Sequence, residues 1–329
     1  MKKYFYVGII LTLILILAAC GGDDNSSEGD SEEKLLTLAT GDSGGTFFAL
    51  GGGLANIYSD LEGYTVNSQS TKGSEVNIDL IEENKAQIGF SNTSIAYYGA
   101  TGAEMFDKKT ENVQGMAEIY PMYYQFVARD GSGIDSVDDI KGKKIAVGEK
   151  GSGTEANVKQ LLEGWDITYE DFEPSYISFS SAVDQMKDKA VDGAFIGAGI
   201  PTSAATDLIS SGDAKLIPME HENLNALIDD KYPFFDTGKI PKGTYPDQEE
   251  DIETATINTS LVVNKDLSED TVYELTKTLY ENLDELESTH DIASEIKLKD
   301  ATEGMSIKIH PGAKKYYEEE DVDIPEEVQ

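Results

Sequence analysis

Residues 35–58, LLTLATGDSGGTFFALGGGLANIY, set the plan of the fold. Apolar side chains alternate over 35–40, which is typical of a short strand, and a small polar turn covers 41–46. Between Phe47 and Tyr58 the apolar residues recur at helical spacing. This stretch therefore predicts a strand, a glycine-rich turn and a helix, in that order.

The same order of elements returns further along the chain. Residues 144–165, KIAVGEKGSGTEANVKQLLEGW, again predict strand, turn and helix. The turn, helix and strand expected over 70–90 likewise have counterparts over 178–196. Because alternating strands and helices imply parallel sheets, we expect two α/β lobes built on one plan.

Two apolar strands, expected over 123–129 and 255–264, cross between the lobes and predict a hinge. A long amphipathic helix is expected over 269–286, followed by an acidic tail. We expect this C-terminal part to pack back on the first lobe. The predicted lobes are therefore residues 35–125 with 254–329 (lobe I) and residues 126–253 (lobe II).

The N-terminus has the pattern of a secretory signal. Lys2 and Lys3 precede an apolar run over 4–19, and small residues and Cys20 follow. The run is shorter than the roughly 20 residues of a membrane-spanning helix, so export is favoured over the alternative of an uncleaved anchor. Leu-Ala-Ala-Cys-Gly over 17–21 resembles the bacterial lipobox, which implies lipid attachment at Cys20 and a signal peptide over 1–19.

The residues after Cys20 are polar and acidic, and they predict a flexible tether over 20–34. We therefore expect an exported protein that is lipid-anchored to the outer face of the cytoplasmic membrane. Because Cys20 is the one cysteine of the chain, neither a disulfide framework nor a multi-thiolate metal site can form.

The charge balance excludes one class of partner. The chain has 62 acidic and 26 basic residues, a formal net charge of −36, which excludes nucleic acid as a partner. The histidines His221, His290 and His310 lack the spacing of metal ligands, so no metal and no cofactor is expected. No phosphate-binding P-loop occurs, and residues 151–156, GSGTEA, match the dinucleotide pattern only loosely.

Residues 41–45, GDSGG, fit the serine-protease string and the Gly-x-Ser-x-Gly elbow of hydrolases. The chain order argues against both: the protease order needs a histidine before the serine, but all three histidines follow Ser43, and the hydrolase elbow needs earlier strands, but Ser43 ends the first strand of the domain. A hydrolase that uses Ser43 stays the enzymatic alternative. The two glycine-rich turns offer backbone N–H groups, hydroxyls and helix starts instead, which suits an anion. The alternative is that Ser43 and Thr154 are ordinary helix caps.

Five strings of the chain resemble the TAXI family of solute receptors, which serve TRAP transporters. The resemblance runs from about Leu36 to Tyr317 and rests on these strings: 39–53, ATGDSGGTFFALGGG; 148–154, GEKGSGT; 232–235, YPFF; 240–246, IPKGTYP; and 310–312, HPG. It implies a two-lobed periplasmic-binding-protein type II-like fold without catalytic activity. It also implies that a glutamate-like or dicarboxylate-like solute is handed to a TRAP membrane permease, and we expect a monomer.

The turns, the repeat and the resemblance together give the candidate ligand-binding residues. They are Ser43, Gly44, Gly45, Thr46, Phe47, Ser70, Ser74, Ser91, Asn92, Tyr124, Gly151, Ser152, Gly153, Thr154, Ser180 and Gly197. Lys72 stands where the family pattern has a small residue; a solvated loop lysine is the favoured interpretation, and the alternative is a counter-charge for a carboxylate. Arg129 follows the crossing strand, so a structural role is favoured for it. A sensor subunit that presents the same solute to a signalling receptor stays open as an alternative.

Overall fold

The computed structural model describes residues 34–329. The predicted signal peptide, the Cys20 anchor and nearly all of the tether lie outside the described residues. Within the described residues, none of the helices combines the length and the apolar character that crossing a bilayer requires.

The first strands and helices follow the order expected from the sequence. The glycine-rich turn links the first strand to the first helix, and a second polar turn links the next pair. The elements are β1 (Lys34–Ala39), α2 (Thr46–Ser59), β2 (Tyr64–Gln69), α3 (Ser74–Glu82), β3 (Ile88–Asn92) and α4 (Thr93–Thr101).

The second half of the fold repeats this plan and adds helices and strands that the sequence analysis did not foresee. Its elements are β5 (Lys144–Ala146), α5 (Gly153–Leu161), β6 (Glu173–Ser175), α6 (Phe179–Lys187), β7 (Gly193–Ala198), α7 (Ser203–Ser210), β8 (Ala214–Ile217), α8 (His221–Asp230) and β9 (Phe235–Ile240).

The strand order demonstrates the repeat directly. Within residues 34–329 one sheet runs β2-β1-β3-β10-β4-β7-β5-β6, with β8 beside β4 and β9 beside β10. β1 pairs in parallel with β2 and β3, and β5 pairs in parallel with β6 and β7. The two ends of the sheet are therefore built alike, as the sequence repeat predicts.

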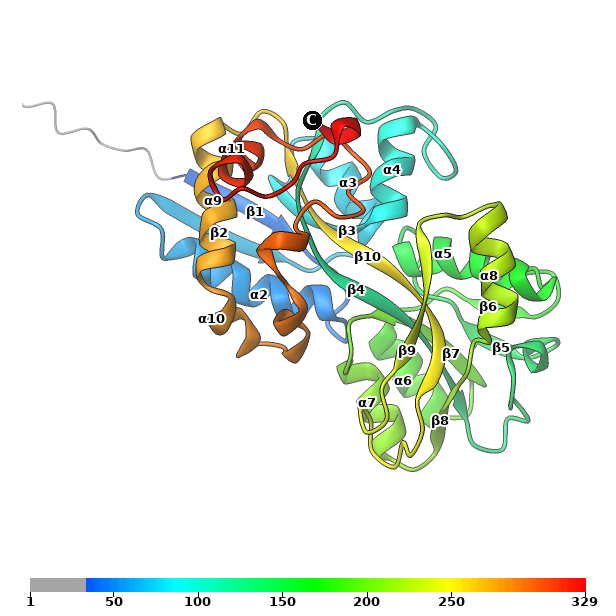
Figure 1. Cartoon of the computed structure of the whole chain (residues 1–329). Helices are drawn as coiled ribbons and strands as arrows, with labels where there is room; N and C mark the ends of the chain where they lie inside the picture. The colour runs from blue at the N-terminus through cyan, green and yellow to red at the C-terminus, as the bar shows by residue number, and fades with distance from the viewer. Residues whose placement is uncertain (1–33) are drawn as a thin grey trace, which may run out of the picture. The chain divides into compact units, whose positions relative to one another are not determined.

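Two long strands join the halves, β4 (Val113–Arg129) and β10 (Ile252–Asn264). They pair with each other in antiparallel fashion and run together through the middle of the molecule (Figure 1). β10 changes partner near Asn258, because Ile252–Ile257 pairs with β9 and the residues after Asn258 pair with β3. This change of partners shows where β10 crosses from one half to the other. The exact boundaries of the two lobes stay a prediction.

The C-terminal part returns to the side of β1 and β2 (Figure 1). It comprises α9 (Glu269–Glu281), α10 (Leu283–Glu287) and α11 (Pro311–Glu319). Lys34 Nζ donates to Thr271 Oγ1 at 2.8 Å, which ties the start of β1 to α9. The single long helix expected over 269–286 is divided at Asn282, whose side chain donates to the carbonyl of Thr278.

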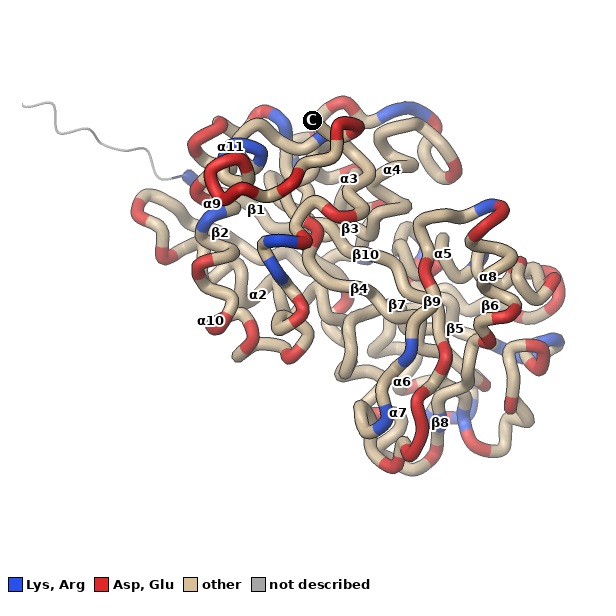
Figure 2. Tube along the Cα trace, in the orientation of Figure 1, with Lys and Arg blue, Asp and Glu red and all other residues tan. Residues whose placement is uncertain are grey.

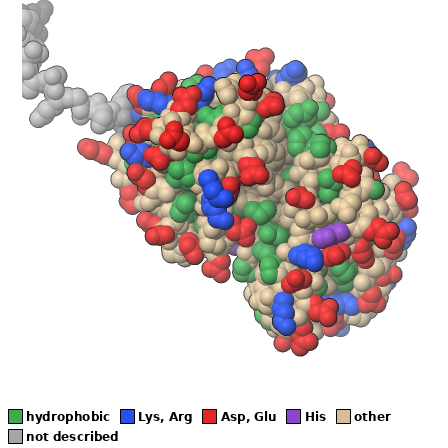
Figure 3. All heavy atoms as spheres, in the orientation of Figure 1, with side chains coloured by type: hydrophobic (Ala, Val, Ile, Leu, Met, Phe, Trp, Pro, Cys, Tyr) green, Lys and Arg blue, Asp and Glu red, His purple; other side chains and the backbone are tan. Residues whose placement is uncertain are grey.

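Acidic residues are spread over both halves rather than gathered in one patch (Figure 2). On the face that Figure 3 shows, lysines lie among them and apolar side chains appear in small separate groups. The apolar interior is one connected cluster that reaches through both ends of the sheet. The distribution of charge is that of a solvated surface.

Candidate functional site

A cavity lies between the two halves, at the carboxyl ends of the parallel strands. It encloses about 480 Å³ of space between protein atoms, including its opening to solvent. In open α/β sheets, ligands bind in the crevice at this end of the strands. The lining residues are Gly41, Asp42, Gly45, Thr46, Phe47, Lys72, Gly73, Ser74, Met122, Glu149, Ser152, Gly153, Thr154, Ser178, Phe179, Gly197 and Ala198.

Four helices start at this cavity, two from each half. For each helix the capping residue and the first helical residue both line it: Gly45 and Thr46 of α2, Gly73 and Ser74 of α3, Ser152 and Gly153 of α5, Ser178 and Phe179 of α6. The first N–H groups of a helix have no partner inside the helix, and its start carries a partial positive charge. The cavity is therefore surrounded by hydrogen-bond donors and by positive helix ends.

The two halves differ in how these helix starts are capped. Ser152 Oγ accepts from the N–H of Glu155, and Ser178 Oγ accepts from the N–H of Ser181. In α2 and α3 the capping residue is a glycine, Gly45 or Gly73, and no side chain caps the helix. The start of α2 consequently keeps the most free donors, because at α3 the N–H of Val76 already meets the carbonyl of Gly151.

The helix starts around the cavity, together with the start of α7, also hold the halves together. Ser43 Oγ lies 3.2 Å from Ser180 Oγ, and the N–H of Val76 donates to the carbonyl of Gly151 at 3.3 Å. Ser203 Oγ donates to the carbonyl of Gly44 at 3.0 Å. The structure is thus the closed arrangement, with the cavity covered on both sides by contacts between halves.

Three ionisable side chains line the cavity: Asp42, Lys72 and Glu149. Asp42 Oδ1 accepts from the N–H of Gly44 at 2.9 Å, and it reaches the N–H and the hydroxyl of Ser180 at 3.4 Å. The side chains of Lys72 and Glu149 make no hydrogen bond or ion pair with residues 34–329. Lys72 is exposed, which leaves its ammonium free for a solute.

Part of the lining is apolar. Phe47 is buried, and its ring stacks on Phe90 with centroids 4.9 Å apart, which fixes its orientation. Phe179, Met122 and Ala198 complete the apolar lining. A solute in this cavity would contact donors at one part of its surface and apolar groups at another.

A buried polar layer lies behind the lining. Asn157 Nδ2 donates to the Tyr124 hydroxyl at 2.6 Å, and Ser94 Oγ donates to Asn157 Oδ1 at 3.0 Å. Asn92 is fully buried, and its Oδ1 has no partner within the described residues. A methyl group on Gly153 would lie 2.5 Å from Asn92 Nδ2, so glycine is what allows α5 to start this close to the first half.

Half of the candidate residues from the sequence line the cavity: Gly45, Thr46, Phe47, Ser74, Ser152, Gly153, Thr154 and Gly197. Ser43, Gly44 and Ser180 line a separate surface depression instead. Ser70, Ser91, Asn92, Tyr124 and Gly151 are not part of the lining. Tyr124 is fully buried because its ring lies beneath Gly197 and its hydroxyl bonds to Asn157, so it is no wall of the cavity.

Several lining residues were not among the sequence candidates: Gly41, Asp42, Gly73, Met122, Glu149, Ser178, Phe179 and Ala198. The repeat held the signal for two of them, because the start of α6 is the counterpart of the start of α3. Asp42 and Glu149 stand inside the two glycine-rich turns, and the pattern of these turns, which suits an anion, gives no reason to expect a carboxylate at the ligand.

The hydrolase alternative for Ser43 lacks a base in this geometry. The hydroxyl of Ser43 faces Ser180, whereas His290 Nε2 lies 3.3 Å from the hydroxyl of Thr46. His290 Nδ1 accepts from the N–H of Ile292, so both ring nitrogens are engaged away from Ser43. Because Nδ1 accepts a hydrogen bond, the neutral ring carries its proton on Nε2 and donates toward Thr46, so His290 is not placed as a base for Ser43.

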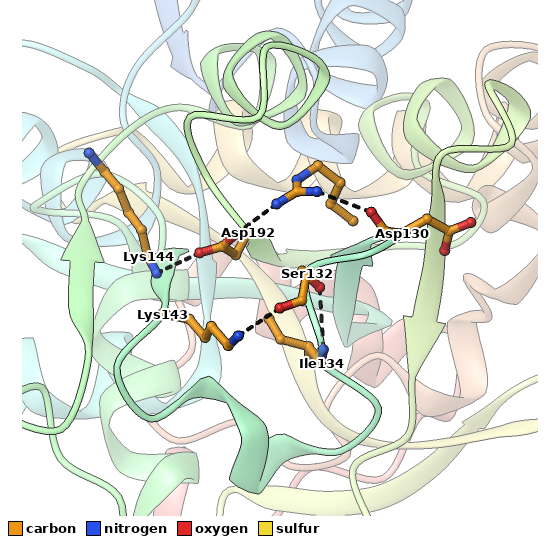
Figure 4. Close-up of polar contacts among 7 residues, drawn as sticks. Asp130, Ser132, Ile134, Lys143, Lys144 and Asp192 are labelled. Carbon is orange, nitrogen blue, oxygen red and sulfur yellow. Dashed lines mark hydrogen bonds and ion pairs between the residues drawn. The ribbon is translucent and has the colours of Figure 1, made fainter.

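Arg129 lies outside the cavity, at the far end of β4. Its guanidinium bonds to Asp192 Oδ1 at 2.8 Å and to the carbonyl of Asp130 at 3.0 Å. Asp192 also accepts from the backbone N–H of Lys144 (Figure 4). Arg129 therefore ties β4 to β5 and β7, a structural position. Within residues 34–329, no group of three or more potential ligand side chains is placed to hold a metal ion.

Comparison with known proteins identifies the fold and the family. The structure is similar to that of the periplasmic binding protein BugD, with a TM-score of 0.55 and 14% identity over 88% of this chain and 94% of that chain. It is also similar to MatC from Rhodopseudomonas palustris with bound malate, with a TM-score of 0.55 and 12% identity over 79% of this chain and 88% of that chain.

At these identities the likeness establishes the fold. The predicted class, two α/β lobes of the periplasmic-binding-protein type II-like fold with a cleft between them, is confirmed. A model of the NMT1-like family matches residues 38–320. The chain belongs to the NMT1-like family.

Proposed function

We propose that the protein is an extracytoplasmic solute-binding receptor without catalytic activity, which holds a small anionic solute between its two lobes. The observation that carries this proposal is the convergence of four helix starts on one cavity. Backbone donors and helix dipoles bind carboxylate, sulfonate or phosphate groups without a dedicated arginine. The periplasmic binding proteins that share the fold, one of them with bound malate, agree with such a role.

Binding follows from the geometry of the two halves. The solute first meets the uncapped starts of α2 and α3, near Lys72. Rotation about β4 and β10 then brings the starts of α5 and α6 onto its other side. Because the solute contacts both halves only when they are closed, its binding energy favours the closed state.

The finer proposal is a TAXI-type receptor of a TRAP transporter. It rests on the resemblance of residues 39–53 and the other four strings to that family, and on the predicted export and lipid anchor at Cys20. A closed, monomeric receptor on a lipid tether would present its solute to the membrane permease while staying within reach of it. Two acyl chains suffice for stable attachment to a membrane.

A ligand screen tests the receptor function. The full-length protein, purified in detergent, is heated with amino acids, dicarboxylates, sulfonates and sugars in turn. A ligand at 100 times its Kd should stabilise the folded state by about 2.7 kcal/mol and raise Tm by several degrees. If no small anion raises Tm, while folding is intact, the proposal is wrong.

Uptake in cells separates transport from sensing. We expect deletion of the gene to abolish uptake of the solute, and we expect uptake to require a sodium gradient rather than ATP. Replacement of Cys20 by serine should release the protein from the membrane fraction. Unchanged uptake together with a lost transcriptional or chemotactic response would instead favour the sensor alternative.

A further inference from the structure

Asp42 occupies a position that a receptor for anions would be expected to avoid. It lines the solute cavity, at the start of α2, where a carboxylate competes with the solute for donors. Its Oδ1 accepts from the N–H of Gly44 within its own turn and also faces the N–H of Ser180, in the first turn of α6. Its Oδ2 has no partner within residues 34–329.

An ordinary turn residue accounts for the contact with Gly44 but not for the contact with Ser180. The latter belongs to the opposite half, so it exists only while the halves are closed. The carboxylate thus sits at the positive end of α6 in the closed state, where a negative charge is stabilised. Of the four helix starts at which an anion could bind, the start of α6 is thus already occupied by the carboxylate of Asp42.

The charges around the cavity can be summed to an order of magnitude. Each helix start is equivalent to roughly +0.5 elementary charge, so four of them contribute about +2. The lining side chains Asp42, Lys72 and Glu149 contribute two negative charges and one positive charge. The sum is about +1, which one net negative charge on the solute would balance and two would exceed.

We propose that Asp42 is a built-in counter-ion that closes α6 onto the first half and restricts the solute to a net charge of −1. This inference rests on the proposed receptor function and specifies the substrate class of its cavity. The accepted solutes carry one net negative charge, such as an acidic amino acid or a monocarboxylate with a hydroxyl or amide group. A dianion would place its second charge against the free Oδ2 of Asp42, in a cavity where water screens it poorly.

The test uses pairs of probes of similar shape that differ by one charge. Glutamate is compared with 2-hydroxyglutarate, and succinamate with succinate, by calorimetric titration of the full-length protein at neutral pH. We expect each monoanion to bind at least about tenfold more tightly than its dianionic partner, because a like charge in a desolvated site costs that much. In Asp42→Asn the preference should fall by about tenfold.

Two further variants separate charge from shape. Asp207→Asn removes an exposed carboxylate outside the cavity, on α7, and should leave the preference for monoanions unchanged. Ser180→Ala removes the hydroxyl that meets Asp42 without altering charge, so it should weaken both members of each pair equally. Asp42→Asn can still accept from the Gly44 N–H through its amide oxygen, and its Tm without probe verifies that it folds.

The outcomes are distinct. A preference for monoanions that falls in Asp42→Asn but persists in Asp207→Asn supports the inference. Dianions that bind the wild-type protein as tightly as monoanions, or a preference that Asp42→Asn leaves intact, overturn the inference and leave the receptor function standing. If neither member of either pair binds the wild-type protein, the receptor function for small carboxylates fails and the inference fails with it.

Discussion

Lys72 is the one lysine or arginine among the residues that line the cavity, and its ammonium has no partner within the described residues. Replacement of Lys72 by methionine keeps the length of the side chain and removes the charge. We expect the affinity for an anionic solute to fall about fivefold, since a partly exposed charge contributes modestly. Lys189→Met, which removes a charge far from the cavity, is the control. Equal affinities in the two variants would contradict a role of Lys72 in binding.

Glu118 on β4 is a buried carboxyl whose pKa burial raises to about 8, with hydrogen bonds from Ser260 and Thr93 as weaker opposing influences. The folded protein therefore keeps a proton that the unfolded chain releases above pH 4.5. Accordingly, this residue makes the free energy of unfolding fall as pH rises from 4.5 to about 8, by at most about 1.4 kcal/mol per pH unit.

Replacement of Glu118 by glutamine tests whether this carboxyl makes the free energy of unfolding fall as pH rises. A neutral amide can accept from Ser260 Oγ and donate to Thr93 Oγ1, and Thr93 keeps its own proton for the carbonyl of Asn258. In urea unfolding at pH 5.5 and pH 8, we expect the variant to lose less stability than the wild-type protein. If both proteins lost the same amount of stability between pH 5.5 and pH 8, the proton responsible would not be that of Glu118.

At the scale of the element, the first turn of α2 is available to a solute because Gly45 cannot cap it. Its backbone is extended, with φ −110° and ψ 164°, which suits serine. Gly45→Ser should add a capping hydroxyl and stabilise the folded state by a few tenths of a kcal/mol. The same hydroxyl takes one of the donors that a solute would use, so we expect several-fold weaker binding by titration.

Gly45→Ala is the matched control for this change. Its methyl group makes the same 3.3 Å approach to the ring of Phe179 but offers no hydroxyl. If alanine weakens binding as much as serine does, the effect is steric, and the capping explanation is wrong.

The elements themselves were largely readable from the sequence. The strand, turn and helix patterns around 35–58 and 144–165 gave the repeat, because strand and helix periods are local properties. The same local rules placed the glycine-rich turns at the carboxyl ends of strands. They did not show the break of α9 at Asn282, whose side chain bonds to a carbonyl of its own helix.

The site was readable only in part, since its geometry depends on distant segments. Tyr124 was expected at the cavity wall, but its hydroxyl meets Asn157, which lies on a helix of the repeated unit. In the sequence, Asp42 belongs to a string that fits serine proteases. Only the structure shows that it lies beside the start of α6. Such cross-half contacts leave no periodic signal, so the sequence alone could not rank these residues.

For the whole molecule, closure of the two halves depends on the solute and also on a rim of direct contacts between the halves outside the cavity. Phe234 of the second half packs against Tyr97 of α4, with centroids 5.0 Å apart, and also meets Tyr98. We expect Phe234→Ala to lower solute affinity about fivefold, because an aromatic pair contributes about 1 kcal/mol to the closed state.

X-ray scattering provides the second measurement for this change. Without solute, the radius of gyration of Phe234→Ala should exceed that of the wild-type protein, because more molecules are open. Tyr176→Ala serves as the control, since Tyr176 is an exposed aromatic residue whose ring contacts, with Tyr169 and with Nζ of Lys150, are to residues of the same half. An identical radius in all three proteins would argue against a role of the rim in closure.

The return of the chain to β1 also dictates an order of events during synthesis. β3 and the first part of β4 receive their common neighbour only from β10, and α9 reaches the start of β1 through Thr271. The strands β5 to β8 pair with one another and with β4, so they can assemble before β10 is made, and only β9 waits for β10. The opposite half must wait for the last quarter of the chain, so an early stop would leave its apolar sheet uncovered and prone to aggregation.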